Sequence, residues 1–153
     1  MARMYARKKG KSGSKKPSKK ATWVTHSPQE IEKLIIKLNK QGMQTAKIGL
    51  ILRDQFGIPS VRDSTNKTML QILNDNELKP KIPEDFFNLL KKAVNLRSHM
   101  SQNKRDAHSK RGLELLESKV RRTAKYYIRQ GDIPTGWKYV PDRAKLIVER
   151  GEL

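Results

Sequence analysis

The sequence contains no cysteine among its 153 residues. This absence excludes disulfide frameworks, cysteine-ligated zinc, thiol nucleophiles and iron–sulfur clusters. No uninterrupted apolar run approaches the roughly 20 residues that a membrane-spanning helix requires, and the N-terminus lacks the apolar segment of a secretory signal. We therefore expect a cytoplasmic chain without a membrane partner.

Acidic side chains are scarce, with 15 Asp and Glu against 34 Lys and Arg, and the formal net charge is +19. So large an excess indicates a polyanionic partner, because solubility alone needs far less charge. Nucleic acid is the leading candidate, since each neutralised phosphate releases a counterion and so adds affinity. Hydrophobic residues make up only 35% of the chain, so any core must be small.

The first 20 residues carry no acid and are interspersed with Gly and Ser. Low apolar content and repulsion between like charges leave nothing to offset chain entropy. We predict a disordered RNA-binding arm over residues 1–24, whose cations thread between phosphates. A solubilising tail or a localisation signal would have the same composition, so both alternatives stay open here. The candidate RNA-binding residues of the arm are Arg3, Arg7, Lys8, Lys9, Lys11, Lys15 and Lys16.

Residues 25–80 predict a small domain of three helices. Ser27, Pro28 and Glu30 form a capping box with proline at the first helical position. This helix should end before Gly42, a second should begin after Thr45 and stop near residue 57, and a third should run from about residue 61 or 65 to residue 80. The expected inward-facing side chains are Ile31, Leu34, Ile35, Leu38, Ile48, Ile51, Leu52, Phe56, Met69, Ile72 and Leu73.

Residues 81–153 predict a helical hairpin followed by a short terminal helix. Apolar residues recur at helical spacing on both sides of a polar loop, which indicates two antiparallel helices whose corner projects into solvent. An aromatic link with Trp137 and Tyr139 leads to the last helix. No segment alternates with the period of a strand, so the predicted fold class is all-α. The expected inner stripes contain Phe86, Leu89, Leu90, Ala93, Leu96 and Met100, then Leu113, Leu116, Val120, Ala124 and Tyr127.

The loop over residues 99–112 mixes an acid, serines and two histidines with cations. Cations alone bind any polyanion, whereas acceptors and hydroxyls can distinguish one base edge from another. The loop therefore predicts an RNA-reading corner beside a cationic helix face. The cations expected to contact phosphate are Lys104, Arg105, Lys110, Arg111, Arg121 and Arg122.

Each of these features also has a simpler structural explanation. Asp106 and Ser109 stand where helix N-caps stand, His99 can lie on an ordinary helix surface, and a run of charge can be only a solvated face. His99, Asp106 and His108 lack the repeated spacing of metal ligands and lie among cations. We therefore expect no metal and no cofactor.

A resemblance to a known family rests on several motifs. The chain contains H-x6-D-x-H-S-K-R-G-L over residues 99–113, the pair Arg121 and Arg122, Tyr126, and a turn over residues 131–134. From about residue 83 to residue 153 it resembles the small-subunit ribosomal protein fifteen family. The upstream part is similar to the N-terminal domain of archaeal and eukaryotic members, in the pair Arg3 and Met4, G-K-S-G-S, W-V-T and I-G-L-I-L-R-D-Q-F-G-I-P-S-V-R.

The resemblance implies a helical, non-enzymatic, structural constituent of the small ribosomal subunit that assists its assembly. Members bind the central domain of small-subunit ribosomal RNA at a three-way junction and at a nearby minor groove with adjacent G·U and G·C pairs. Neighbouring ribosomal proteins and large-subunit RNA at a subunit bridge are the other implied partners. The positions that match the minor-groove triad are His99, Asp106 and Ser109, and those that match the junction contact are Lys92, Arg122 and Tyr126.

The chain departs from the bacterial members at the junction contact. They have a Thr-Gly pair and a Gln where this sequence has Lys79, Pro80 and Asp85. The junction contact should therefore differ in detail. We expect Lys79, Lys81 or the basic arm to supply replacements.

Two other functional classes are weaker. Residues 45–56 and the helix after Val61 can be interpreted as a helix-turn-helix that binds DNA, but the charge is denser over the arm and the hairpin. An enzyme would need paired carboxylates, an activated nucleophile or a cofactor-binding loop, and no recognisable spacing of this kind occurs. We therefore expect no enzyme activity and no DNA partner.

Overall fold

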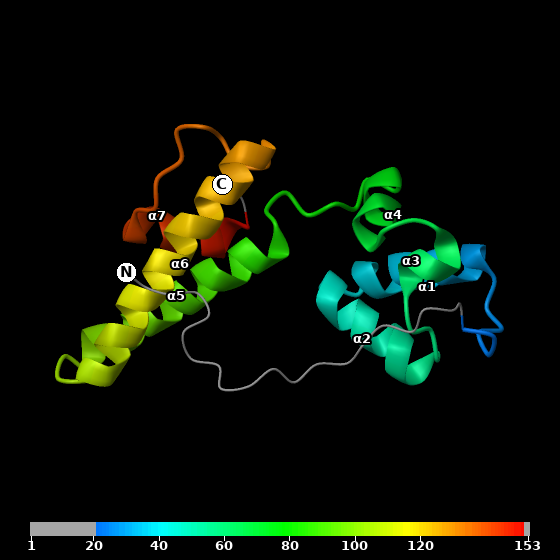
Figure 1. Cartoon of the computed structure of the whole chain (residues 1–153). Helices are drawn as coiled ribbons and strands as arrows, with labels where there is room; N and C mark the ends of the chain where they lie inside the picture. Colours follow the sequence, from blue (N-terminus) through cyan, green and yellow to red (C-terminus); the bar gives the residue numbers. More distant parts are fainter. Residues whose placement is uncertain (1–20, 152–153) are drawn as a thin grey trace. The chain divides into compact units, whose positions relative to one another are not determined.

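The computed structural model describes residues 21–151, which contain helices and no strand, so the all-α prediction is confirmed. The predicted arm falls largely on residues 1–20, outside the described residues. None of the described helices is long and apolar enough to cross a membrane. The helices are α1 (Pro28–Lys40), α2 (Thr45–Gln55), α3 (Val61–Thr65), α4 (Met69–Asp75), α5 (Glu84–Gln102), α6 (Ala107–Gln130) and α7 (Pro141–Arg150) (Figure 1).

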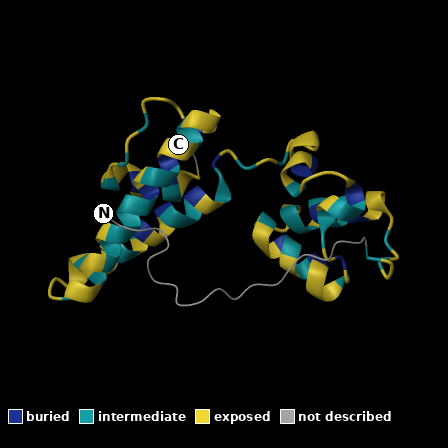
Figure 2. Ribbon diagram, viewed as in Figure 1, coloured by how far each residue is buried: buried dark blue, intermediate teal, exposed yellow. Residues whose placement is uncertain are grey.

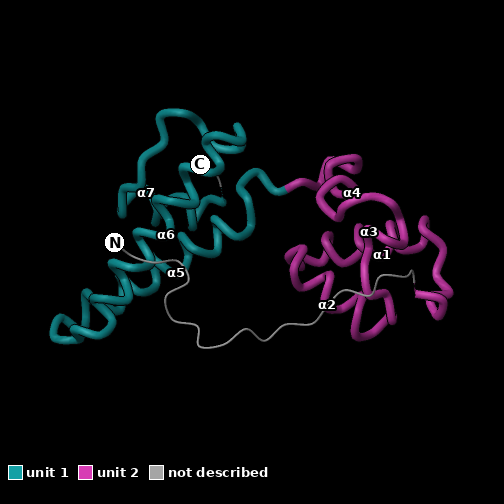
Figure 3. Tube along the Cα trace, in the orientation of Figure 1, with its two compact units in different colours: residues 1–10, 80–153 teal, residues 11–79 magenta. Residues whose placement is uncertain are grey.

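The chain divides into two compact units at residues 79 and 80 (Figure 3). We call the described residues 21–79 the N-terminal unit and residues 80–151 the C-terminal unit. Each unit has its own cluster of buried apolar side chains. The two cores can therefore be considered separately.

The start of α1 is defined by the capping box that the sequence predicts. Ser27 Oγ accepts from the Glu30 N–H at 3.3 Å, and the Glu30 carboxylate accepts from the Ser27 N–H at 2.8 Å. Pro28 follows in the first turn, where no intrahelical N–H bond is lost. The helix ends at Lys40, and Gly42 then adopts a φ of +80°, which favours glycine. Both predicted ends of this helix are confirmed.

The interval predicted as the third helix contains two helices, α3 and α4. Asn66 follows α3 with a φ of 58°, and such left-handed backbone cannot continue a right-handed helix. Asn adopts this conformation more readily than most other residues. A second capping box then starts α4, because Thr68 Oγ1 accepts from the Gln71 N–H and the Gln71 side chain accepts from the Thr68 N–H.

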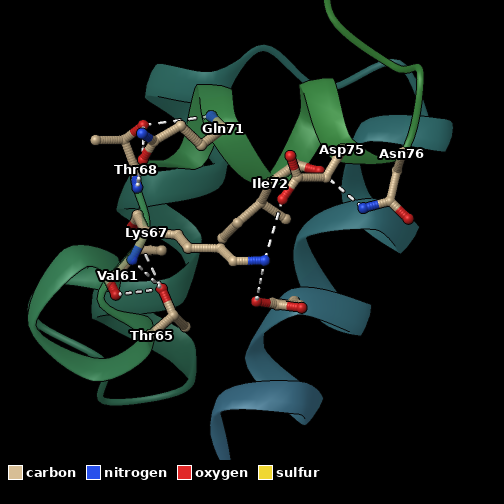
Figure 4. Close-up of polar contacts among 9 residues, drawn as sticks. Val61, Thr65, Lys67, Thr68, Gln71, Ile72, Asp75 and Asn76 are labelled. Carbon is tan, nitrogen blue, oxygen red and sulfur yellow. Dashed lines mark hydrogen bonds and ion pairs between the residues drawn. The ribbon is translucent and has the colours of Figure 1, made fainter.

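Polar contacts hold the turn between α3 and α4 (Figure 4). The hydroxyl of buried Thr65 donates to the Val61 carbonyl at 2.9 Å and accepts from the Lys67 N–H at 3.3 Å. Lys67 Nζ lies 3.0 Å from Asp75 Oδ2 and 3.7 Å from Glu32 Oε1, so it links the turn to α4 and α1. Since these ionic side chains are substantially exposed, the buried Thr65 bonds should contribute more to the turn than the ion pairs do.

The core of the N-terminal unit forms between α1, α2, α4 and the segment after α2. Its packing extends to Val24, and the Trp23 Nε1–H donates to the Gly57 carbonyl at 3.1 Å. The predicted boundary after residue 24 therefore falls within a packed segment. Among the predicted inward residues, Leu34, Leu38, Phe56 and Met69 are only partly buried and pack against the core. The buried members are Ile31, Ile35, Ile48, Leu52, Ile58, Ile72 and Leu73.

The C-terminal unit is the predicted hairpin of α5 and α6, with α7 packed against α5 (Figure 1). Phe86 is completely buried, and its ring centroid lies 5.3 Å from that of Trp137 and 6.3 Å from that of Tyr127. The aromatic link predicted from the sequence therefore packs on the hairpin. The buried core consists of Ile82, Phe86, Leu90, Val120, Ala124, Ile133, Ala144 and Ile147.

Asp85, one of the departures from the bacterial pattern, joins the two hairpin helices. The Tyr127 hydroxyl donates to Asp85 Oδ1 at 2.6 Å. Burial, together with this bond, raises the pKa of Tyr127, so the phenol stays protonated and continues to donate. Asp85 thus has a structural contact inside the C-terminal unit.

The corner end of the hairpin is less buried than its base (Figure 2). Leu96, Met100, Leu113 and Leu116, predicted for the inner stripes, have intermediate exposure and are not in the buried core. The stripes do face each other, because a Cβ on Gly112 would lie 3.9 Å from Leu96 Cδ2. The core side chains of α7 pack with those of the hairpin base, so two helices alone form the corner end and cannot enclose its side chains.

Candidate nucleic-acid interface

Asp106 begins α6 as its N-cap. Its Oδ1 accepts from the Ser109 backbone N–H at 2.9 Å, and its carbonyl accepts from the Lys110 N–H at 3.0 Å. A carboxylate suits this position because it pairs with an exposed amide and balances the positive end of the helix dipole. The capping alternative is therefore confirmed for Asp106. Ser109 lies inside α6 and is not an N-cap.

The second carboxylate oxygen of Asp106 contacts the end of α5. Asp106 Oδ2 lies 3.1 Å from His99 Nε2. Asn103, the C-cap of α5, places Nδ2 3.3 Å from His99 Nδ1 and 3.2 Å from the His99 carbonyl oxygen. We call Asn103, His99, Asp106 and Ser109 the corner cluster. The structure thus brings together the three residues predicted for the minor groove and adds Asn103 to them.

The Asp106 carboxyl is ionised and accessible. Hydrogen bonds from the Ser109 hydroxyl and backbone N–H, and then from His99, hold its pKa well below the usual range. The side chain of Asp106 is 34% exposed and that of His99 is 45% exposed, so a ligand can reach both. A carboxylate has about four acceptor positions, and the contacts inside the corner cluster leave part of that capacity for a donor outside the protein.

Cations surround this carboxylate. Lys104 and Arg105 occupy the tight turn between α5 and α6, and together with His99, Gln102, Asn103 and Asp106 they line a hollow on the surface. Lys110 and Arg111 are exposed in the first turns of α6. A negative acceptor inside a positive rim can bind a donor on a polyanion, because the cations offset its repulsion from phosphate.

The residues predicted for the junction contact lie on both helices of the hairpin. Lys92 is exposed on α5, while Arg122 and Tyr126 are four residues apart on α6 and so share a face. Tyr126 is 55% exposed, which leaves its side chain accessible for stacking. Two guanidinium nitrogens of Arg122, Nε and Nη2, are buried without a hydrogen-bond partner. Buried cationic donors normally have a partner, so these two nitrogens are an exception to that rule.

Arg121, another of the predicted phosphate-binding cations, has partners within the unit. Its Nη2 lies 3.6 Å from Glu117 Oε2, and its guanidinium stands 5.8 Å from the centroid of the Tyr139 ring. Glu117 also accepts from Arg97 Nη2 at 2.6 Å and from the Tyr139 hydroxyl at 3.4 Å. The partly buried Glu117 therefore balances cations of α5 and α6 and attaches the aromatic link to both helices.

Two other expectations concern metals and DNA. Over residues 21–151 no group of three or more His, Cys, Asp or Glu side chains is arranged to hold a metal ion. For a helix-turn-helix, the recognition helix would follow Val61, but the helices in that interval are α3 with five residues and α4 with seven. A helix of that length extends only about 10 Å, which offers little surface to a major groove.

Sequence reasoning did not identify Asn103 or Glu117 as part of this surface. Asn103 follows His99 by four residues, a helical spacing that places the two side chains on one face and is the signal that was available. For Glu117 the available signal was that it is one of only two acids, with Glu114, among the many cations of α6. Its partner Tyr139 is 22 residues away, and no local pattern predicts that contact.

Comparisons with known proteins agree with this architecture. A family model described as "Ribosomal S13/S15 N-terminal domain" matches residues 1–58. A second, described as "Ribosomal protein S15", matches residues 69–147. The small ribosomal subunit protein uS15 of Methanobrevibacter smithii is 52% identical over 127 residues, which cover 83% of this chain and 96% of the relative. Those of Methanoculleus marisnigri and Methanococcus vannielii are 45% and 47% identical, over 98% and 97% of this chain and 100% of each relative.

The matches therefore extend over both units and over nearly the full length of the relatives. They confirm the resemblance that was inferred from the corner and from the N-terminal motifs. The chain belongs to the ribosomal protein S15 family.

Proposed function

We propose that this chain binds small-subunit ribosomal RNA at a three-way junction and at an adjacent minor groove, and thereby assists assembly of the subunit. The broader role follows from the family: the chain is a structural, non-enzymatic constituent of the small ribosomal subunit in the cytoplasm. Neighbouring ribosomal proteins and large-subunit RNA at a subunit bridge are further proposed partners.

The observation that carries the minor-groove proposal is the ionised, accessible carboxylate of Asp106 within a rim of cations. An RNA minor groove is wide and shallow and presents guanine amino groups and 2′-hydroxyls. A carboxylate accepts from the guanine amino group, which lysine and arginine cannot do because they only donate. His99 and Ser109 lie beside this carboxylate, where they can hydrogen-bond to 2′-hydroxyls. Lys104 and Arg105 lie in the adjacent turn and can pair with phosphates.

The junction proposal rests on the α6 face with Arg122 and Tyr126, together with Lys92 on α5. Arg122 is only partly buried as a whole residue, so its positive charge can attract an RNA phosphate even though its Nε and Nη2 atoms are enclosed by the protein. The exposed Tyr126 ring can stack on an unpaired base, which is how RNA loops and junctions are often bound. The Tyr126 ring and the Arg122 guanidinium on one helix face are better suited to an RNA junction than to a regular duplex.

Ultraviolet crosslinking of the protein in its own cells, followed by sequencing of the attached nucleic acid, tests the proposed function. We expect crosslinks to concentrate on the central domain of small-subunit ribosomal RNA, with residues 99–109 as one attachment site. Crosslinks scattered over unrelated RNA, or found at discrete DNA sites, would contradict the proposal. In that case the corner carboxylate would be only a helix cap.

A truncated chain tests whether residues 1–80 contribute to the junction contact. The bacterial Thr-Gly pair and Gln are replaced by Lys79, Pro80 and Asp85, and Asp85 is engaged with Tyr127. We therefore expect removal of residues 1–80 to weaken binding to an isolated three-way junction RNA, measured by filter binding at fixed salt. Retention of the helical circular-dichroism spectrum would show that the hairpin is still folded. Unchanged affinity for the junction RNA would then exclude a contribution from the deleted residues.

A further inference from the structure

The orientation of the Asn103 side-chain amide is determined by its neighbours. One atom of the amide lies 3.2 Å from the His99 carbonyl oxygen and 3.3 Å from His99 Nδ1. A carbonyl oxygen can only accept a hydrogen bond. The amide atom at this position must therefore be the nitrogen, which carries two hydrogens and can donate to both neighbours.

This orientation determines which imidazole nitrogen of His99 carries the proton. Because Asn103 Nδ2 only donates, His99 Nδ1 must accept and is unprotonated. In a neutral imidazole the other nitrogen then bears the hydrogen. His99 Nε2 lies 3.1 Å from Asp106 Oδ2, so its N–H donates to the carboxylate. The opposite tautomer would be unfavourable in this ring position, because a lone pair on His99 Nε2 would then face a lone pair on Asp106 Oδ2.

We propose that Asn103 is a positioning residue that holds His99 as the Nε2–H tautomer, so that Asp106 is presented to RNA as an oriented acceptor. Donors then bind Asp106 from two sides, the Ser109 N–H at Oδ1 and His99 at Oδ2. They restrict rotation of the carboxylate and leave its remaining acceptor positions on the accessible side. The inference rests on the proposed minor-groove function and assigns to Asn103 a part in the selection of a guanine amino group.

Two measurements on the full-length protein test this role, with Asn103→Leu as the variant. The first is a nitrogen–proton NMR correlation of the imidazole groups, with His99 assigned by comparison with His99→Phe. The wild type should show an unprotonated Nδ1 and a protonated Nε2. In Asn103→Leu the Nε2–H signal should broaden through exchange with water, because the ring loses its second anchor.

The second measurement compares an RNA duplex that contains adjacent G·U and G·C pairs with the same duplex carrying inosine, which lacks the guanine amino group. The wild type should bind the guanine duplex at least about fivefold more tightly, the lower end of a base-edge contact. For Asn103→Leu this ratio should fall below about twofold as the acceptor loses its orientation. Ser101→Ala is the matched control, since it removes a bond to the Ser98 carbonyl in the same turn without touching the corner cluster, and both readouts should match the wild type.

The outcomes separate this inference from the proposed function. If the wild type does not distinguish guanine from inosine, the minor-groove proposal fails and the role of Asn103 fails with it. If the wild type discriminates and Asn103→Leu discriminates equally well, only the role of Asn103 is overturned. A proton on Nδ1 in the wild type, or an unchanged Nε2–H signal in Asn103→Leu, would also overturn it.

Discussion

Replacement of Phe86 by Ala should destabilise the C-terminal unit by about 3 to 5 kcal/mol, the usual cost of truncating a fully buried phenylalanine. Phe86 has no exposed surface, and its ring contacts those of Trp137 and Tyr127. Its removal opens a cavity between α5, α6 and the aromatic link. Since the whole stability of a small domain is typically only about 5 to 15 kcal/mol, this single change should remove a large fraction of the stability of the unit.

Fluorescence can report this change separately for each unit, because the chain has two tryptophans and each unit contains one. In a Trp23→Phe background, urea unfolding followed by Trp137 emission should move to much lower denaturant with Phe86→Ala. In a Trp137→Phe background, Trp23 emission should report the same midpoint with and without the change. Ile35→Ala, in the core of the N-terminal unit, is the matched control. It should lower the midpoint that Trp23 reports and leave the midpoint that Trp137 reports unchanged. A common shift of both midpoints would mean that the cores do not unfold independently.

Replacement of Asp106 should have the largest effect on RNA selectivity, and two substitutions separate its two roles. Asn is as good an N-cap as Asp, so Asp106→Asn should retain the start of α6. It nevertheless loses the carboxylate and turns an amide donor or a weaker acceptor toward His99 and the RNA. We expect affinity for the guanine duplex to fall roughly 5- to 150-fold, as for loss of a base-edge contact, with little change for the inosine duplex. Asp106→Ala should lose the cap as well and lower the melting temperature.

The control for this prediction is a change in charge alone. In a variant with Lys104→Ala and Arg105→Ala, the slope of log affinity against log salt should decrease by about 0.7 to 0.9 for each phosphate contact that is lost. Its preference for guanine over inosine should remain, whereas Asp106→Asn should keep the slope and lose the preference. Tighter binding of Asp106→Asn to both duplexes would mean that the carboxylate only repels RNA and reads no base.

Much of the fold was predictable because its signals are local. The capping box at Ser27 and Glu30 involves side chains three residues apart, and the helical periodicity of each apolar stripe is read within a few turns. The break between α3 and α4 was missed although local signals existed, in the left-handed Asn66 and the box of Thr68 and Gln71. Apolar periodicity continues across this break, so a pattern of hydrophobicity alone does not detect it.

The candidate site was predicted in part. Its residue types, and the corner that carries them, followed from the motif over residues 99–113 and from the cationic surroundings. The contact between His99 and Asp106 was not predictable from spacing, because their seven-residue separation crosses the turn between α5 and α6. The same is true of the bond between Asp85 and Tyr127, which are 42 residues apart.

The sequence by itself determined that this protein is helical, strongly basic, free of cysteine chemistry and built around a polar corner between two amphipathic segments. These properties depend on composition and on neighbours along the chain. Only the tertiary structure decided how the corner works: the register of α5 against α6 brings Asp106 into hydrogen-bonding distance of His99. That register is determined by the packing of Phe86, Leu90, Val120 and Ala124 at the base of the hairpin, since the few interactions at the exposed corner are too weak to hold it alone.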